Sequence, residues 1–150
     1  MKHYILLLIT CTLVACGGLH GTGTGNPFQN SNSGTSTISG SVFYYTCQVL
    51  RKCNPGMTDF MCATGIQNVV GFAPKLGVAD GSLTANQIVS YEMQKLLTAD
   101  AVQADKCSAQ LLKIPCDDIR MQEAYDPASA QPFAKTPDML DPVCTGVFGP

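Results

Sequence analysis

The side chains in this chain that could do chemistry are carboxylates and cysteines. The two histidines, His3 and His20, both lie near the amino terminus. The segment from residue 40 onward therefore offers no Ser-His-Asp or Cys-His catalytic group, no histidine-bound zinc and no haem attachment. Its acid–base candidates are the adjacent pair Asp117 and Asp118, with Glu123 close behind. Paired carboxylates can provide the acid and the base for glycoside hydrolysis.

A structural role explains Asp117 and Asp118 more simply than catalysis does. They precede an apolar pattern, Ile119, Met121 and Tyr125, that has the spacing of a short helix. An aspartate at that point caps the helix and interacts favourably with the helix dipole. We therefore predict a helix cap here and assign no catalytic residue.

The segment from Asp80 to Thr84 is similar to the second half of an EF-hand calcium loop. In that alignment the first and third ligand positions fall on Leu76 and Val78, and the twelfth falls on Gln87 in place of a bidentate glutamate. Too few oxygen ligands remain to hold calcium. The sequence predicts no metal site and no cofactor.

The amino-terminal residues have the pattern of an export signal. A positive start at residues 1–3 precedes an apolar run over residues 4–14. A membrane-spanning helix needs about 20 apolar residues, so this run has the length of a signal peptide. It ends in Leu13-Val14-Ala15-Cys16, which resembles the lipobox of bacterial lipoproteins.

The lipoprotein resemblance implies how the chain is processed and where it is held. The signal peptide, residues 1–15, would be cut off before Cys16, and Cys16 would then carry a diacylglycerol and an amide-linked acyl chain such as palmitate. The only membrane contact expected is through this lipid. An aspartate after the lipidated cysteine often favours the inner membrane, so Gly17 favours the outer membrane.

Residues 16–39 are rich in Gly, Thr, Ser and Asn, which predicts a flexible tether between the lipid and a globular domain over residues 40–150. Removing Lys2 from the nine basic residues leaves eight against eleven acidic ones, a net charge of −3. Nucleic-acid binding needs a basic surface, so we expect no nucleic-acid partner.

Six cysteines fall within the predicted domain. In an exported protein this even number predicts three disulfides, and it leaves their pairing open. No two of them form a C-x-x-C motif of a redox or zinc site. The six are Cys47, Cys53, Cys62, Cys107, Cys116 and Cys144.

The expected fold is a small, mainly α domain stapled by disulfides. The segment 42–50 suits either a helix or a strand; we favour the helix, with Phe43, Tyr44 and Tyr45 in the core rather than on a binding surface. The alternative is an α+β fold with a short hairpin over 41–50. Prolines at 127, 132, 137 and 142 predict an irregular tail, held to the body through Cys144.

Short-range signals predict where several helices begin and end. Thr58 can cap a short helix, which Gly65 would end in the left-handed conformation. Thr84 and Gln87 form a capping box, followed by a helix with a buried stripe. This stripe consists of Ile88, Val89, Met93, Leu96 and Leu97. A second helix beginning at Asp100, or a continuation of the first, would reach Pro115.

These observations favour a non-enzymatic lipoprotein of the bacterial cell envelope. Its domain would have a binding or structural role, with another envelope protein or a glycan as partner. Two alternatives remain open. One is a carboxylate-dependent hydrolase of envelope polysaccharide that uses Asp117 or Asp118, and the other is an enzyme inhibitor built on the disulfide scaffold.

Overall fold

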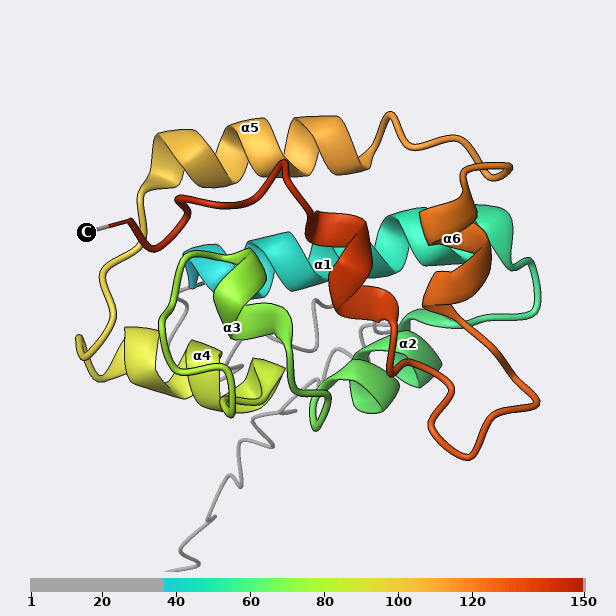
Figure 1. Cartoon of the computed structure of the whole chain (residues 1–150), viewed down its shortest axis with the longest axis horizontal. Helices are drawn as coiled ribbons and strands as arrows, with labels where there is room; N and C mark the ends of the chain where they lie inside the picture. Colours follow the sequence, from blue (N-terminus) through green and yellow to red (C-terminus); the bar gives the residue numbers. More distant parts are fainter. Residues whose placement is uncertain (1–36, 150) are drawn as a thin grey trace, which may run out of the picture.

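The computed structural model describes residues 37–149, and over this range the chain is helical and has no β-strand (Figure 1). The prediction of a mainly α domain is confirmed. The alternative hairpin over 41–50 is wrong, because a helix covers that segment. In order, the elements are α1 (Ile38–Cys53), α2 (Asp59–Ile66), α3 (Phe72–Lys75), α4 (Ala85–Met93), α5 (Ala101–Leu111), α6 (Ile119–Ala124) and the 3₁₀ helix η1 (Thr136–Leu140).

Helix α1 lies at the centre of the fold and contacts α5, α2, α4 and α6 (Figure 1). Thr37 caps its first turn, since the Thr37 hydroxyl accepts a hydrogen bond from the Gly40 N–H at 3.0 Å. Ser39 is fully buried. Helix α1 therefore begins at Ile38, inside the span 16–39 predicted as a tether, and residues 16–36 of that span lie outside the described residues.

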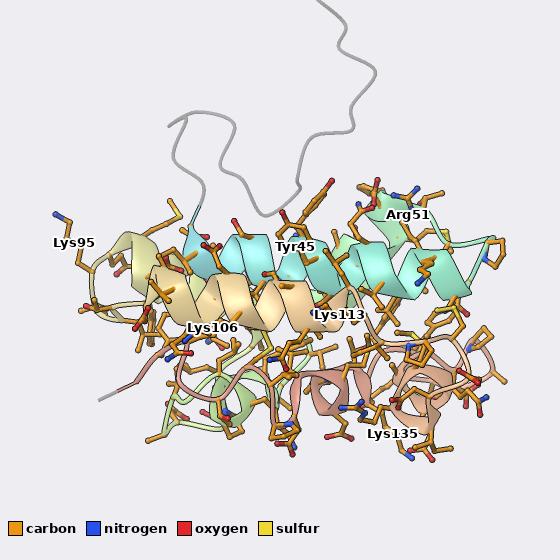
Figure 2. The ribbon with its side chains drawn as sticks, turned by 90° about the horizontal axis from the view of Figure 1, so that it is seen from above. Tyr45, Arg51, Lys95, Lys106, Lys113 and Lys135 are labelled. Atoms are coloured by element: carbon orange, nitrogen blue, oxygen red, sulfur yellow. A yellow bond between two sulfur atoms is a disulfide. The ribbon has the colours of Figure 1, made fainter. Side chains whose placement is uncertain are left out.

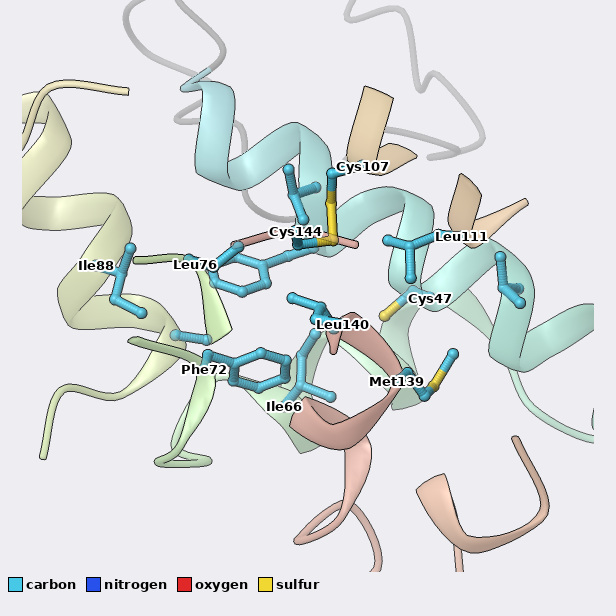
Figure 3. Packing of buried hydrophobic residues seen from close by; sticks show 14 of the residues in the cluster. Cys47, Ile66, Phe72, Leu76, Ile88, Cys107, Leu111, Met139, Leu140 and Cys144 are labelled. Carbon is cyan, nitrogen blue, oxygen red and sulfur yellow. A yellow bond between two sulfur atoms is a disulfide. The ribbon is translucent and has the colours of Figure 1, made fainter. Parts of the chain in front are cut away.

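Burial explains why the strand-favouring segment of α1 is helical. Its buried side chains recur at helical spacing: Val42, Phe43, Thr46, Cys47, Val49 and Leu50. The ring of Phe43 packs edge to face on Phe72 of α3, with 5.0 Å between ring centroids. Leu140 of η1 lies at the centre of the same core, as Figure 3 shows. Tyr45, by contrast, lies half-buried on the outer side of α1 (Figure 2). Packing against these neighbours outweighs the intrinsic β-propensity of the segment.

The three predicted disulfides are present and use all six domain cysteines. Cys47 pairs with Cys62, Cys53 with Cys116, and Cys107 with Cys144. The first joins α1 to α2, and the second joins the end of α1 to the segment before α6. The third ties the C-terminal tail to α5 (Figure 3), as the sequence predicts for Cys144.

The capping box that starts α4 is confirmed, but the stripe after it is only partly correct. The Thr84 hydroxyl accepts from the Gln87 N–H, and the Gln87 side chain accepts from the Thr84 N–H. Ile88 and Val89 are buried as predicted. The helix ends at Met93, however, and the predicted core residues Met93 and Leu96 are 45% and 64% exposed.

The chain reverses direction after α4 at Lys95, which has a positive φ of 59°. Asp100 then caps α5, so the two helices are separate. The tail is mostly turns, yet Pro137 is accommodated near the start of η1. A proline in the first turn of a helix loses no hydrogen bond, so the expectation that the prolines exclude all regular structure was wrong at this position.

Candidate functional site

A groove of about 650 Å³ lies between the C-terminal end of α2 and the loop before η1. It is partly open to solvent. None of its nine lining residues carries a charge: Gly65, Asn68, Val69, Val70, Ala130, Gln131, Pro132, Phe133 and Ala134.

The contact that brings the two walls together is between Gly65 and Phe133. A Cβ built on residue 65 would lie 2.1 Å from Cε2 of the Phe133 ring, well inside van der Waals contact. The sequence predicts Gly65 as a left-handed helix end, and this is wrong. Gly65 lies within α2, and the residues with positive φ in 37–149 are Lys95 and three other glycines. Gly65 is used for close approach, which any larger side chain would prevent.

Phe133 also packs against Tyr125. The two rings are 4.9 Å apart between centroids, and Phe133 is only 8% exposed. Thr136 fixes the following turn, because its hydroxyl donates to the Ala124 carbonyl at 2.7 Å. The position of Phe133 in the groove lining is therefore set by contacts to the C-terminal end of α6.

Backbone hydrogen bonds fix both rims of the groove. On the α2 side, the Ala85 N–H donates to the Val69 carbonyl at 3.2 Å, which joins this rim to the start of α4. On the other side, the Asp126 N–H donates to the Pro132 carbonyl at 2.9 Å and closes the loop. A rim tied in this way is already ordered before a ligand binds, so less conformational entropy is lost on binding.

The groove offers neutral hydrogen-bonding groups beside apolar surface. Asn68 and Gln131 are exposed and each supplies an amide with both a donor and an acceptor. Val70 is 54% exposed at the same site. Such a lining suits an uncharged ligand with hydroxyl or amide groups, because a charged ligand would lose hydration without gaining an ion pair.

The carboxylates singled out in the sequence are not brought together in this groove. Asp118 caps α6, as predicted, by accepting from the Arg120 N–H at 2.9 Å. The Arg120 side chain also pairs with it, with Nη2 2.7 Å from Oδ2. Asp117 is exposed, and Glu123 forms an ion pair with Lys135 at 3.1 Å.

Electrostatics also argue against Asp118 as a general acid. The side-chain and backbone hydrogen bonds from Arg120 hold the pKa of Asp118 below its usual value. A general acid must keep its proton near neutral pH, and enzymes achieve this by raising the pKa. The pKa of Asp118 is lowered, which is the opposite of what a general acid needs.

The calcium-like segment forms a turn. Asp80 accepts from both the N–H and the hydroxyl of Ser82, at 3.0 and 2.6 Å, and the hydroxyl bond lowers the pKa of Asp80. Within residues 37–149, no three His, Cys, Asp or Glu side chains are grouped so that they could hold a metal ion. Over the same range, no helix is long and apolar enough to cross a membrane. Cys16 lies outside the described residues.

One structurally important carboxylate was missed by sequence reasoning. Glu92 of α4 accepts from the backbone N–H groups of Ile38 and Ser39 at 2.7 and 2.9 Å, and from the Ser39 hydroxyl at 2.5 Å. It thereby supplies the negative charge that the first turn of α1 lacks in its own sequence. In the sequence, the absence of an acidic residue from the first turn of α1 is the only local sign that a charge must come from elsewhere. It does not indicate that Glu92 is the residue that supplies this charge.

Comparison with known proteins gives no further guide to the site: no protein-family description, curated protein or solved structure matches this chain.

Proposed function

We propose that this chain is a lipid-anchored protein of the bacterial cell envelope whose domain has a non-enzymatic binding role. The lipobox-like segment ending at Cys16 supports the anchor, and Gly17 favours the outer membrane. Three disulfides support the location, because they are typical of compartments outside the cytoplasm.

The observation that carries the binding role is the uncharged groove beside Phe133. Phe133 and neutral amides line it, and no acid–base pair does. The partner would be an envelope protein or a glycan that presents an uncharged segment to this groove. Polysaccharide hydrolysis is less favoured, since Asp118 is committed to Arg120 and to the cap of α6.

The anchor is tested by fractionation of cells that express the full chain. Wild-type protein should sediment with membranes and leave them only with detergent. The variant Cys16→Ser should remain an uncleaved precursor, because in lipoproteins the signal peptidase acts after lipidation. Processing of Cys16→Ser to a protein of mature size would contradict the anchor.

The binding role is tested by capture from envelope extract with a lipid-free form of the protein. Val70→Asp places a charge in the groove, and Leu112→Asp is the control, because Leu112 is similarly exposed at 46% but lies after α5. Val70→Asp should lose the partner that wild type and Leu112→Asp retain, with unchanged circular dichroism. Equal capture by all three forms would show that the groove is not the contact surface.

A further inference from the structure

An exposed apolar corner follows from the early end of α4. Tyr91 and Leu96 are 36% and 64% exposed, and they lie together because the Leu96 N–H donates to the Tyr91 carbonyl at 2.8 Å. Lys95 belongs to the same turn, and Figure 2 shows its side chain projecting from one end of the molecule. We refer to Tyr91, Lys95 and Leu96 as the α4 corner.

The amino-terminal end of the domain is joined to this corner. Glu92 follows Tyr91 of the corner in the sequence. Its carboxylate accepts hydrogen bonds from the N–H groups of Ile38 and Ser39 at 2.7 and 2.9 Å. The chain that leads back to Cys16 therefore enters the domain within hydrogen-bonding distance of α4. Because the Glu92 carboxylate is directed at the start of α1, the charge that projects from the corner is the ammonium of Lys95.

The composition of the corner suits the surface of a bilayer. A leucine side chain gains by leaving water, and tyrosine is enriched at membrane–water interfaces. A lysine can place its apolar stem among them while its ammonium stays in the headgroup layer. Anionic headgroups would add an attraction to Lys95.

We propose that the α4 corner contacts the headgroup region of the bilayer that holds the lipid on Cys16. This inference rests on the proposed lipid anchor. Residues 17–36 separate Cys16 from the described domain, and a chain of that length can extend by at most about 70 Å. The domain is therefore held near the same membrane, so a contact too weak to bind a free domain can still form.

The chain contains no tryptophan, which provides a direct test. Leu96→Trp places a single fluorophore in the corner. Leu112→Trp is the matched control: Leu112 is also an exposed leucine and follows the far end of α5, a helix about 16 Å long. Both full-length lipidated proteins are reconstituted into vesicles made with lipids brominated near the headgroup end of the acyl chain. Leu96→Trp should lose most of its emission and shift to shorter wavelength, while Leu112→Trp should keep its emission.

The possible outcomes separate this inference from the anchor. Protein that does not float with the vesicles would contradict the anchor itself. Protein that floats but shows equal quenching at both positions, or none at either, would overturn the corner contact and leave the anchor standing. A blue shift of Leu96→Trp that grows with protein concentration without quenching would indicate a second copy and would also overturn it.

Two further measurements complete the test. If Leu96→Trp does not fold, Tyr91→Trp takes its place, because Tyr91 is also exposed in the corner. The lipid-free form of Leu96→Trp, mixed with the same vesicles, should show no quenching. Strong quenching of that form would show that the corner binds the bilayer without the lipid anchor, and would overturn the claim that the contact depends on it.

Discussion

The ring of Phe133 occupies the space in which a side chain on Gly65 would begin, with Cε2 2.1 Å from the position of a Cβ. Gly65 lies inside α2, where glycine is about 1 kcal/mol less favourable than alanine. The close contact offsets that cost, because it lets the C-terminal loop pack directly on the helix backbone and form one side of the groove.

Replacing Gly65 by alanine should therefore destabilise the domain, although helix propensity alone predicts the opposite. We expect a loss of about 1–3 kcal/mol in the free energy of unfolding, as for other overpacked sites. Urea denaturation measures this loss of free energy of unfolding. Gly56→Ala is the control, because a Cβ there meets nothing within 4 Å. The additional change Phe133→Leu should recover part of the loss in Gly65→Ala, and a stabilised Gly65→Ala would contradict the packing described.

The ion pair between Asp118 and Arg120 predicts a dependence of stability on acid pH. Arg120 lowers the folded-state pKa of Asp118, so the unfolded chain takes up this proton at higher pH than the folded chain. The stabilising contribution is complete above about pH 4 and is lost as the pH falls through the folded-state pKa. Wild type should therefore exceed Asp118→Asn in stability at neutral pH and lose that advantage in acid.

Unfolding in urea at several pH values between neutrality and strong acid measures this effect. Asparagine keeps a side-chain oxygen for capping α6, so the comparison isolates the charge. Asp117→Asn, at an exposed neighbouring residue, is the control and should change the pH profile little. A constant difference between wild type and Asp118→Asn at every pH would contradict the role of the ion pair.

Sequence reasoning succeeded where the interaction is short-range. The hydroxyl of Thr58 accepts from Met61, Thr84 and Gln87 cap each other, and Asp118 accepts from Arg120, all within three residues along the chain. Such contacts depend on residue type and spacing, which the sequence displays directly. The helical class of the domain follows from the same signals.

The sequence could not indicate contacts between residues far apart along the chain. Glu92 meets the start of α1 across a separation of 54 residues, and Phe133 reaches Gly65 from the tail. The even cysteine number predicts disulfides but leaves their pairing open. Helical periodicity also continues past Met93 in the sequence, whereas the backbone turns at Lys95, a residue type without the positive-φ preference of glycine.

Reduction of the disulfides should unfold the domain. In the chain-entropy model, loops closed over 15, 63 and 37 residues are worth about 3–5 kcal/mol each, against about 5–15 kcal/mol for a whole domain. Helical circular dichroism should therefore be lost when reductant is added. The denatured lipidated protein should titrate no thiol before reduction, and six thiols at that stage would contradict the pairing.

The disulfide between Cys53 and Cys116 offers the clearest single test of this contribution. Cys116 is exposed and Cys53 only half-buried, so serine at both positions leaves no fully buried hydroxyl. The double variant should lose about 3–5 kcal/mol in the free energy of unfolding, mainly because its unfolded chain is less restricted. An unchanged free energy of unfolding would show that this cross-link does not restrict the unfolded chain.

Glu92 should contribute more to stability than an ordinary surface glutamate. Its carboxylate accepts two backbone N–H groups at the start of α1 and the Ser39 hydroxyl, and these donors lose their partner in Glu92→Ala. We expect a loss of about 1–2 kcal/mol, comparable with removal of a strong helix cap. Glu92→Gln should lose less, because its amide oxygen still accepts one of these bonds. Thermal or urea unfolding of the three forms checks this order.

Glu123→Ala is the matched control for Glu92→Ala. Glu123 also pairs through its carboxylate, but with Lys135 at an exposed site, where both side chains are at least half exposed. An ion pair of that kind contributes about 0–1 kcal/mol and weakens further in salt. Glu92→Ala should remain the more destabilised variant at high salt, because its bonds are to backbone N–H groups of a helix terminus. Equal losses for the two variants would show that Glu92 does not hold the start of α1.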